Sequence, residues 1–161
     1  MKNSSTKNTL EPQEQTEVMD MMNQSISIGI VGNYSDGYET RMLLTPEACG
    51  MLTSAGIGIC MESGAGSDIS FPDEKYAEYG VHIVTRDQAL KSPLVLSYAS
   101  LKAKDIKKMH KGSALLCLMD KSLFEESTIK ALLAHRITCG CFDNMYSHND
   151  EPVFSNILDE I

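Results

Sequence analysis

One arginine in this sequence stands where it could hold a negatively charged ligand. Arg41 lies between an apolar run, Ser25–Val31, and a helix start at Thr45-Pro46. An arginine guanidinium forms paired hydrogen bonds with a carboxylate, so this side chain could bind and orient a small acid. Loops that follow strands commonly carry function. A structural role, in which Arg41 pairs with Glu39 or Asp36 of the same loop, stays open beside it.

Further polar residues follow the other apolar runs. In parallel sheets, ligands lie beyond the carboxyl ends of the strands. The candidate substrate-binding residues that we assign to this edge are Arg41, Tyr98, Asp120 and Lys121. The same argument brings further polar residues there, namely Tyr34, Asp36, Glu62, Ser63, Ser100, Asp143 and Asn144.

The elements that would position these residues alternate along the chain. Apolar runs predict strands at 25–31, 57–61, 81–84, 93–98, 113–119 and 137–142. Helices are expected between them, at 46–55, before Gly80, and at 86–91, 102–110 and 123–135. This alternation predicts an α/β fold of three layers, with a mostly parallel sheet and helices on both faces, of the flavodoxin-like or Rossmann-like type.

Two of the expected helices carry clear local signals. Thr45 suits the N-cap of the first helix, Pro46 its first position and Gly56 its end. The apolar face expected for this helix consists of Leu44, Ala48, Met51, Leu52 and Ala55. In the last helix, the residues expected to point inward are Ile129, Leu132 and Leu133.

The chain divides into a polar extension and one domain. Residues 1–24 are rich in polar residues, and part of them has the composition for one short helix that would be marginal alone. Residues 25–161 have the length of a single domain. Apolar residues recur with helical spacing in 150–161, up to the last residue. We expect either a truncated relative of something larger or a face that a partner covers.

Composition argues against several classes of protein. A net charge of −8 and a pI of about 4.9 disfavour nucleic-acid binding, which relies on Lys and Arg. No run approaches the roughly 18 apolar residues of a membrane span. The N-terminus has no apolar core of the signal-peptide type, and the five cysteines are an odd number. Reduced thiols in a cytoplasmic protein are therefore expected.

Cys139 and Cys141 are two residues apart on an expected strand, which places both thiols on one face. A redox or metal pair would need further ligands, and the near candidates are His135 and His148. Buried core thiols are the favoured interpretation.

Several stretches of the chain form an ordered set, namely Arg41–Pro46, Met61–Gly66, Phe71–Gly80, Ile83-Val84, Leu94–Leu96 and Cys141–Asp143. Together they resemble the N-terminal domain shared by alanine dehydrogenases and the α subunit of proton-translocating nicotinamide nucleotide transhydrogenases. The resemblance runs from about Ile26 to the end of the chain. Pro12-Gln13-Glu14 is also similar to an extension that some alanine dehydrogenases carry.

The resemblance implies a domain that takes an amino acid or oxo acid and works against a separate Rossmann domain that binds NAD(P). In the dehydrogenases, the arginine of the Arg-x-x-Leu-Thr-Pro motif holds the substrate carboxylate, and Arg41 matches it. The family's lysine after the fourth strand matches Ala99, and its histidine after the fifth strand matches Asp120. The usual Pro-Lys-Glu after the first strand is replaced by Val31-Gly32-Asn33.

These departures bear on the chemistry. Oxo-acid reduction needs a proton donor with a pKa near neutral, which an alanine cannot supply. Ionised Asp120 would repel a carboxylate, and Lys102 and Lys121 are the nearby residues that could substitute. No Gly-x-Gly-x-x-Gly follows a strand, and Gly64-Ala65-Gly66 has no third glycine.

We therefore expect the N-terminal substrate-domain segment of an alanine dehydrogenase/transhydrogenase-like oxidoreductase, inactive alone and binding no cofactor by itself. NAD(P) is implied for the full-length family. Two alternatives stay open. One is a non-enzymatic module that binds a small carboxylic acid or docks on a protein. The other is a split subunit that pairs with a separate NAD-binding chain. A homo-oligomer is compatible with each of these.

Overall fold

The computed structural model describes residues 27–32, 42–67, 71–118, 124–142 and 145–151. The strands are β1 (Ser27–Val31), β2 (Gly58–Glu62), β3 (His82–Val84), β4 (Leu94–Ser97), β5 (Ala114–Cys117) and β6 (Thr138–Cys141). The helices are α2 (Pro46–Ser54), α3 (Asp73–Glu78), α4 (Arg86–Ala89), α5 (Ala103–Ile106) and α6 (Glu126–His135). Each lies where the sequence predicts an element, and α4, α5 and α6 are shorter than expected.

All six strands form one parallel sheet in the order β3-β2-β1-β4-β5-β6. This is the strand order of the doubly wound dinucleotide-binding folds, and it differs from the flavodoxin order. The direction in which the chain adds strands reverses between β1 and β4. The expected parallel α/β sheet is confirmed, and its order is Rossmann-like.

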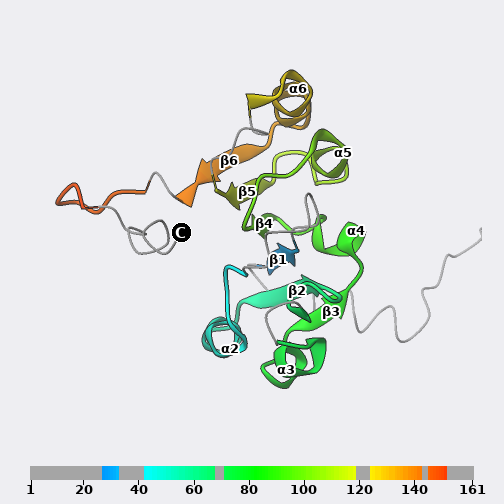
Figure 1. Cartoon of the computed structure of the whole chain (residues 1–161), viewed down its shortest axis with the longest axis vertical. Coiled ribbons are helices and arrows are strands. Elements are labelled where there is room, and N and C mark those ends of the chain that lie inside the picture. Colours follow the sequence, from blue (N-terminus) through cyan, green and yellow to red (C-terminus); the bar gives the residue numbers. More distant parts are fainter. Residues whose placement is uncertain (1–26, 33–41, 68–70, 119–123, 143–144, 152–161) are drawn as a thin grey trace, which may run out of the picture.

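Helices cover both faces of the sheet (Figure 1). One buried apolar cluster joins Cys49 of α2 and Tyr76 of α3 to Ile30 and Ile59 of the sheet. The other cluster lies under α4, α5 and α6, and its members include Ala89, Ile106, Ala131, Val95 and Leu115. The arrangement is therefore three-layered, as right-handed crossovers on either side of the reversal require.

The sequence of β1 shows how the two faces are divided. Ile28 and Ile30 point to the α2–α3 side, and Val31 belongs to the cluster under α4–α6. Gly29 points to that second side, where a Cβ atom would overlap the backbone carbonyl of Ala89 in α4. Glycine at this position lets α4 approach the sheet closely.

The N-terminus of α2 is built as expected. Thr45 Oγ1 accepts a hydrogen bond of 3.3 Å from the backbone N–H of Ala48, and Pro46 occupies the first turn. The expected inward face is partly wrong, because Pro46 and Cys49 are the buried residues and Met51 is 77% exposed. The crossover from β1 to β2 determines which side of α2 faces the sheet. That side carries Pro46 and Cys49.

The orientation expected for α6 is also wrong in part. Its buried residues are Thr128 and Ala131, whereas Ile129 is 41% and Leu133 is 73% exposed. Leu132 packs against the apolar cluster, as expected. Because α6 lies against α5 as well as on the sheet, small side chains at the contact allow a closer approach than Ile or Leu would.

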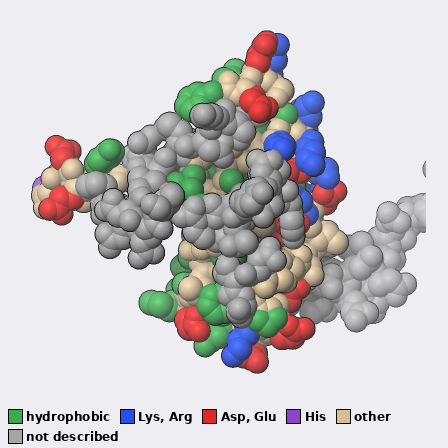
Figure 2. Space-filling view, viewed as in Figure 1, with side chains coloured by type: hydrophobic (Ala, Val, Ile, Leu, Met, Phe, Trp, Pro, Cys, Tyr) green, Lys and Arg blue, Asp and Glu red, His purple; other side chains and the backbone are tan. Residues whose placement is uncertain are grey.

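Residues 1–26 and 152–161 lie outside the described residues, so the N-terminal extension, its short helix and the C-terminal apolar segment remain predictions. No helix in the described ranges is long and apolar enough to cross a bilayer. Lys and Arg side chains gather on the side of the molecule that carries α4 and α5 (Figure 2). Around α5, Lys104, Lys107 and Lys108 are exposed to solvent.

Candidate functional site

Of the four predicted substrate-binding residues, Tyr98 lies in the described part of the chain. It directly follows β4 and is 6% exposed, with its ring packed edge-on against Phe142 at 6.3 Å between centroids. The carbonyl of Tyr98 accepts a 2.9 Å hydrogen bond from the N–H of Leu118. Tyr98 therefore forms part of the wall at the carboxyl ends of β4, β5 and β6.

Arg41, Asp120 and Lys121 lie outside the described residues, and their roles remain predictions. So do Tyr34, Asp36, Asp143 and Asn144 of the same edge. Residues 42–44, which follow Arg41, are anchored to the scaffold. Met42 and Leu44 pack against the α2–α3 cluster, and the carbonyl of Leu44 accepts a 2.9 Å hydrogen bond from the Tyr76 hydroxyl.

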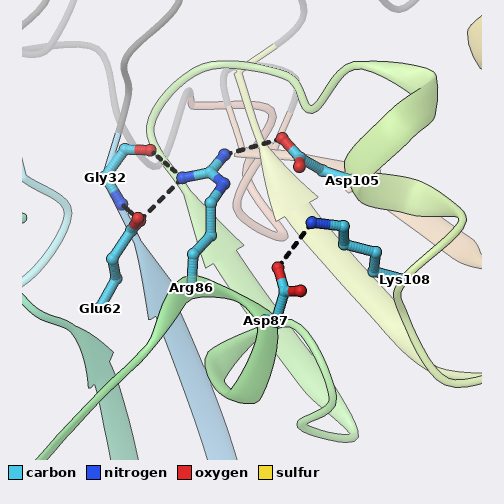
Figure 3. A network of polar contacts seen from close by, with 6 residues as sticks. All are labelled: Gly32, Glu62, Arg86, Asp87, Asp105 and Lys108. Atoms are coloured by element: carbon cyan, nitrogen blue, oxygen red, sulfur yellow. Dashed lines mark hydrogen bonds and ion pairs between the residues drawn. The ribbon is translucent and has the colours of Figure 1, made fainter.

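An ion-pair network around Arg86 occupies the carboxyl edge of the sheet (Figure 3). Arg86 is the first residue of α4, after β3, and its guanidinium donates to Glu62 Oε2 at 2.7 Å and to Asp105 Oδ2 at 2.9 Å. Glu62 ends β2, and Asp105 belongs to α5. The network thus joins the end of β2 to α4, which follows β3, and to α5, which follows β4.

The same network holds the residue that follows β1. The N–H of Gly32 donates to Glu62 Oε2 at 2.9 Å, and the carbonyl of Gly32 accepts from Arg86 at 2.9 Å. Gly32 directly precedes the 33–41 segment, which ends at Arg41. With Leu44 bound to Tyr76 on the other side, both ends of the segment that carries Arg41 are fixed to the scaffold.

The electrostatics of the network favour a charged, fully engaged guanidinium. Burial lowers the pKa of Arg86, but hydrogen bonds and charges from Asp105 and Glu62 outweigh it and raise the pKa above its ordinary value. The side chain of Arg86 is 23% exposed, against 10% for Glu62 and 7% for Asp105. Arg86 serves as a crosslink whose charge is already balanced by two carboxylates.

The sequence does not predict this role for Arg86, which it places at the start of a helix. Glu62 is predicted at the ligand edge. The signal for it is a cation two residues after β3 and an acid at the end of the neighbouring β2, because parallel neighbours bring such residues together.

The glycine turn after β2 is filled by the chain itself. The N–H of Gly64 donates to both carboxylate oxygens of Asp73, at 2.9 and 3.0 Å, and Ser63 Oγ donates to Asp73 Oδ2 at 2.7 Å. A Cβ at Gly66 would meet the carbonyl of Phe71 at 2.5 Å. The Gly64 amide is therefore engaged by an internal carboxylate, and close packing explains the second glycine.

Three thiols meet at the end of β5 and β6. The Sγ atoms of Cys117, Cys139 and Cys141 lie within 4.8 Å of one another. Hydrogen bonding with Cys117 lowers the pKa of Cys139 to about 7 despite burial, and Cys141 adds to this effect. Burial alone raises the pKa of Cys49 to about 11. The expected one-sided Cys139–Cys141 pair is confirmed, and its neighbour is Cys117, not His135 or His148.

A shallow pocket lies at the opposite end of the sheet. Its volume is about 470 Å³, and it is lined by Lys111, Gly112, Ala134 and Arg136. These residues precede β5 and β6, so the pocket faces the amino-terminal ends of the strands. Strand topology places the ligand edge at the other end.

Comparison with known proteins decides the family. Residues 30–157 match the model of the family described as alanine dehydrogenase/PNT, N-terminal domain. The chain belongs to this family. The match covers the end of β1, the strands β2 to β6 and the helices that hold the Arg86 network, and it confirms the resemblance seen in the sequence. A comparison with curated proteins found no match.

Two solved structures share the fold of this chain. A transhydrogenase from Sinorhizobium meliloti is 25% identical, with a TM-score of 0.65, over 73% of this chain and 35% of its own. An L-alanine dehydrogenase is 22% identical, with a TM-score of 0.68, over 78% of this chain and 35% of its own. The chain thus spans about a third of the length of these relatives.

Proposed function

We propose that this chain supplies the substrate side of an alanine dehydrogenase/transhydrogenase-like oxidoreductase and does not transfer hydride alone. It would hold a small amino or oxo acid through Arg41, with Tyr98, Asp120 and Lys121 at the same edge. The observation that carries the proposal is the double anchoring of the Arg41 segment, at Gly32 by Glu62 and Arg86 and at Leu44 by Tyr76.

The position of this anchoring supports a binding role. The segment that carries Arg41 follows Gly32 in the sequence, and Gly32 lies at the carboxyl end of β1, beside the point where strand order reverses between β1 and β4. Doubly wound sheets bind ligands at that crevice. Arg86 is engaged by Glu62 and Asp105, which leaves carboxylate binding to Arg41 in this proposal.

The NAD(P)-binding site is proposed to belong to another domain or subunit. The sequence contains no Gly-x-Gly-x-x-Gly, and the glycine turn at Gly64 binds the carboxylate of Asp73. NAD(P) would therefore bind to a separate domain or subunit. A split subunit that pairs with such a chain fits this arrangement, and a cytoplasmic setting is in keeping with it.

The acid–base residues that the family resemblance implies are also replaced in this chain. Ala99 follows Tyr98 at the carboxyl end of β4, where the family resemblance implies a lysine, and Asp120 stands where it implies a histidine. Neither residue supplies a proton donor of near-neutral pKa unless Asp120 is strongly perturbed. Binding without turnover is the expected behaviour of the isolated chain.

The test is an NADH-oxidation assay of the purified chain with pyruvate, with and without ammonium. We expect no turnover above the protein-free rate. Steady turnover by the chain alone, abolished in Arg41→Ala, would overturn the proposal. Activity that arises only when an NAD-binding chain is added would identify the split-subunit form.

A further inference from the structure

The cysteine cluster at the ends of β5 and β6 has the geometry of a ligand set. Cys117 is the last residue of β5, and its partner in the parallel register is Cys141, the last residue of β6. Cys139 lies two residues earlier on β6 and therefore on the same face. The three Sγ atoms form a triangle with no side longer than 4.8 Å.

The spacing of the sulfur atoms suits one ion at their centre. Metal–thiolate bonds of zinc are about 2.3 Å long, so three sulfurs around one such ion lie roughly 4 Å apart. The observed limit of 4.8 Å exceeds this spacing by less than 1 Å. Side-chain rotation is enough to close that difference, since the two strands are already in register.

The chemistry of the donors selects the kind of ion. Within the described ranges, no His, Asp or Glu joins the three sulfurs, so the set is entirely soft. Soft thiolate ligands select copper(I) and zinc, whereas Mg²⁺ and Ca²⁺ take oxygen ligands. Cys117 is buried and the other two are half-buried, which leaves a side from which an ion can enter.

We propose that Cys117, Cys139 and Cys141 form a three-thiolate site for a thiophilic metal ion, copper(I) or zinc(II). Copper(I) is complete with three sulfurs. Zinc prefers four ligands and would add a water on the half-buried side. The ion would link the ends of β5 and β6 beside the predicted ligand edge. Its ligand on β5, Cys117, precedes Asp120 by three residues.

The test uses the reduced, metal-free full chain. It is titrated with Zn²⁺ and, anaerobically, with Cu(I), each against a chromophoric chelator, and with Co²⁺ as a spectroscopic probe. We expect one ion per chain and a thiolate-to-cobalt charge-transfer band. Retention of either ion against the chelator, at one per chain, supports the proposal. A chain that retains neither ion against the chelator overturns the proposal.

Single Cys→Ser variants locate the site. Cys139→Ser and Cys141→Ser are expected to lose at least tenfold in affinity and to weaken the charge-transfer band, as is Cys117→Ser if it folds. The matched control is Cys60→Ser, which removes another half-buried strand thiol outside the cluster. Equal loss in Cys60→Ser, or full binding in both β6 variants, overturns the assignment.

Alkylation provides a second readout on the wild-type chain. Bound ion should protect the half-buried Cys139 and Cys141 from iodoacetamide, measured by peptide mass spectrometry, and leave the labelling of Cys60 unchanged. Equal labelling of Cys139 and Cys141 with and without the ion overturns the proposal.

Discussion

The guanidinium of Arg86 lies 2.7 Å from Oε2 of Glu62, so the first residue of α4 is tied to the last residue of β2. The same carboxylate oxygen accepts the N–H of Gly32. One pair of side chains therefore joins the ends of β1 and β2 to α4, and Asp105 extends the link to α5. The segment that carries Arg41 starts from this joint.

Removing one partner of the pair should destabilise the fold strongly. Arg86→Ala leaves the carboxylates of Glu62 and Asp105 largely buried and without their counter-charge, which typically costs about 3–5 kcal/mol. Urea unfolding followed by circular dichroism measures the change in the free energy of unfolding.

The matched control for this substitution is Lys108→Ala. It breaks the exposed pair with Asp87 and should leave the unfolding midpoint unchanged. If Arg86→Ala unfolds at the wild-type urea concentration, the network does not stabilise the carboxyl edge.

Gly29→Ala should be the more damaging of two strand-glycine substitutions. Its new Cβ meets the backbone carbonyl of Ala89, which moves only with α4, whereas Gly140→Ala meets the flexible tip of Leu116 at 2.8 Å. Overpacking of this kind costs about 1–3 kcal/mol, and rigid backbone puts Gly29→Ala at the upper end. Thermal unfolding compares the two. A lower melting temperature for Gly140→Ala than for Gly29→Ala would contradict the close approach of α4.

The buried hydroxyl of Tyr76 should make the fold less stable at alkaline pH. Burial raises its pKa to about 12, with smaller contributions from Cys49 and Glu47. An unfolded tyrosine has a pKa of about 10. A pKa raised on folding gives stability that is present below pH 10 and is lost as the pH rises towards 12.

Comparison with Tyr76→Phe isolates the contribution of Tyr76 ionisation to the free energy of unfolding. At neutral pH the variant should be about 1 kcal/mol less stable, because the hydrogen bond to the carbonyl of Leu44 is lost. Between pH 10 and 12 that deficit should shrink, since only the wild type must keep a phenol protonated. Unfolding free energies measured at pH 7, 10 and 11.5 give the comparison. A deficit that stays constant with pH would show that Tyr76 titrates normally.

Local signals predicted most of the fold. The Thr45 cap, Pro46 and the apolar strand runs are properties of neighbouring residues, and the structure has these elements in place. Which side of a helix faces the sheet depends on its partners. Met51 and Leu133 are exposed although the apolar pattern placed them inward, because crossover direction and helix–helix packing decide the contact.

The site was harder to predict than the fold because its contacts join distant residues. Arg86 reaches Glu62, which is 24 residues away, and Asp105, which is 19 away. Cys117 joins Cys139 and Cys141 only through the register of β5 on β6. Spacing along one strand revealed the Cys139–Cys141 pair, but no pattern within one segment shows which residues a neighbouring strand adds.

Arg41 should carry the carboxylate affinity of the chain. Pyruvate at about 100 times its Kd stabilises a folded protein by about 2.7 kcal/mol. For a chain of this size that corresponds to a rise in melting temperature of roughly 5–11 °C. Arg41→Ala should remove the rise, because the alanine offers no paired donors.

The matched control for Arg41→Ala is Arg136→Asn, at an exposed position beyond α6 where φ is 53°. Asparagine tolerates this backbone conformation. The control should keep the full stabilisation by pyruvate. Loss of the rise in Arg136→Asn as well would assign the effect to net charge and not to Arg41.

The most direct measurement is a thermal-shift titration of the purified chain with pyruvate, alanine and NADH in parallel. Stabilisation by a small acid, its loss in Arg41→Ala and no stabilisation by NADH are the predicted result. Stabilisation by NADH, or none by any small carboxylic acid, would contradict the assignment of this chain to the substrate side of the reaction.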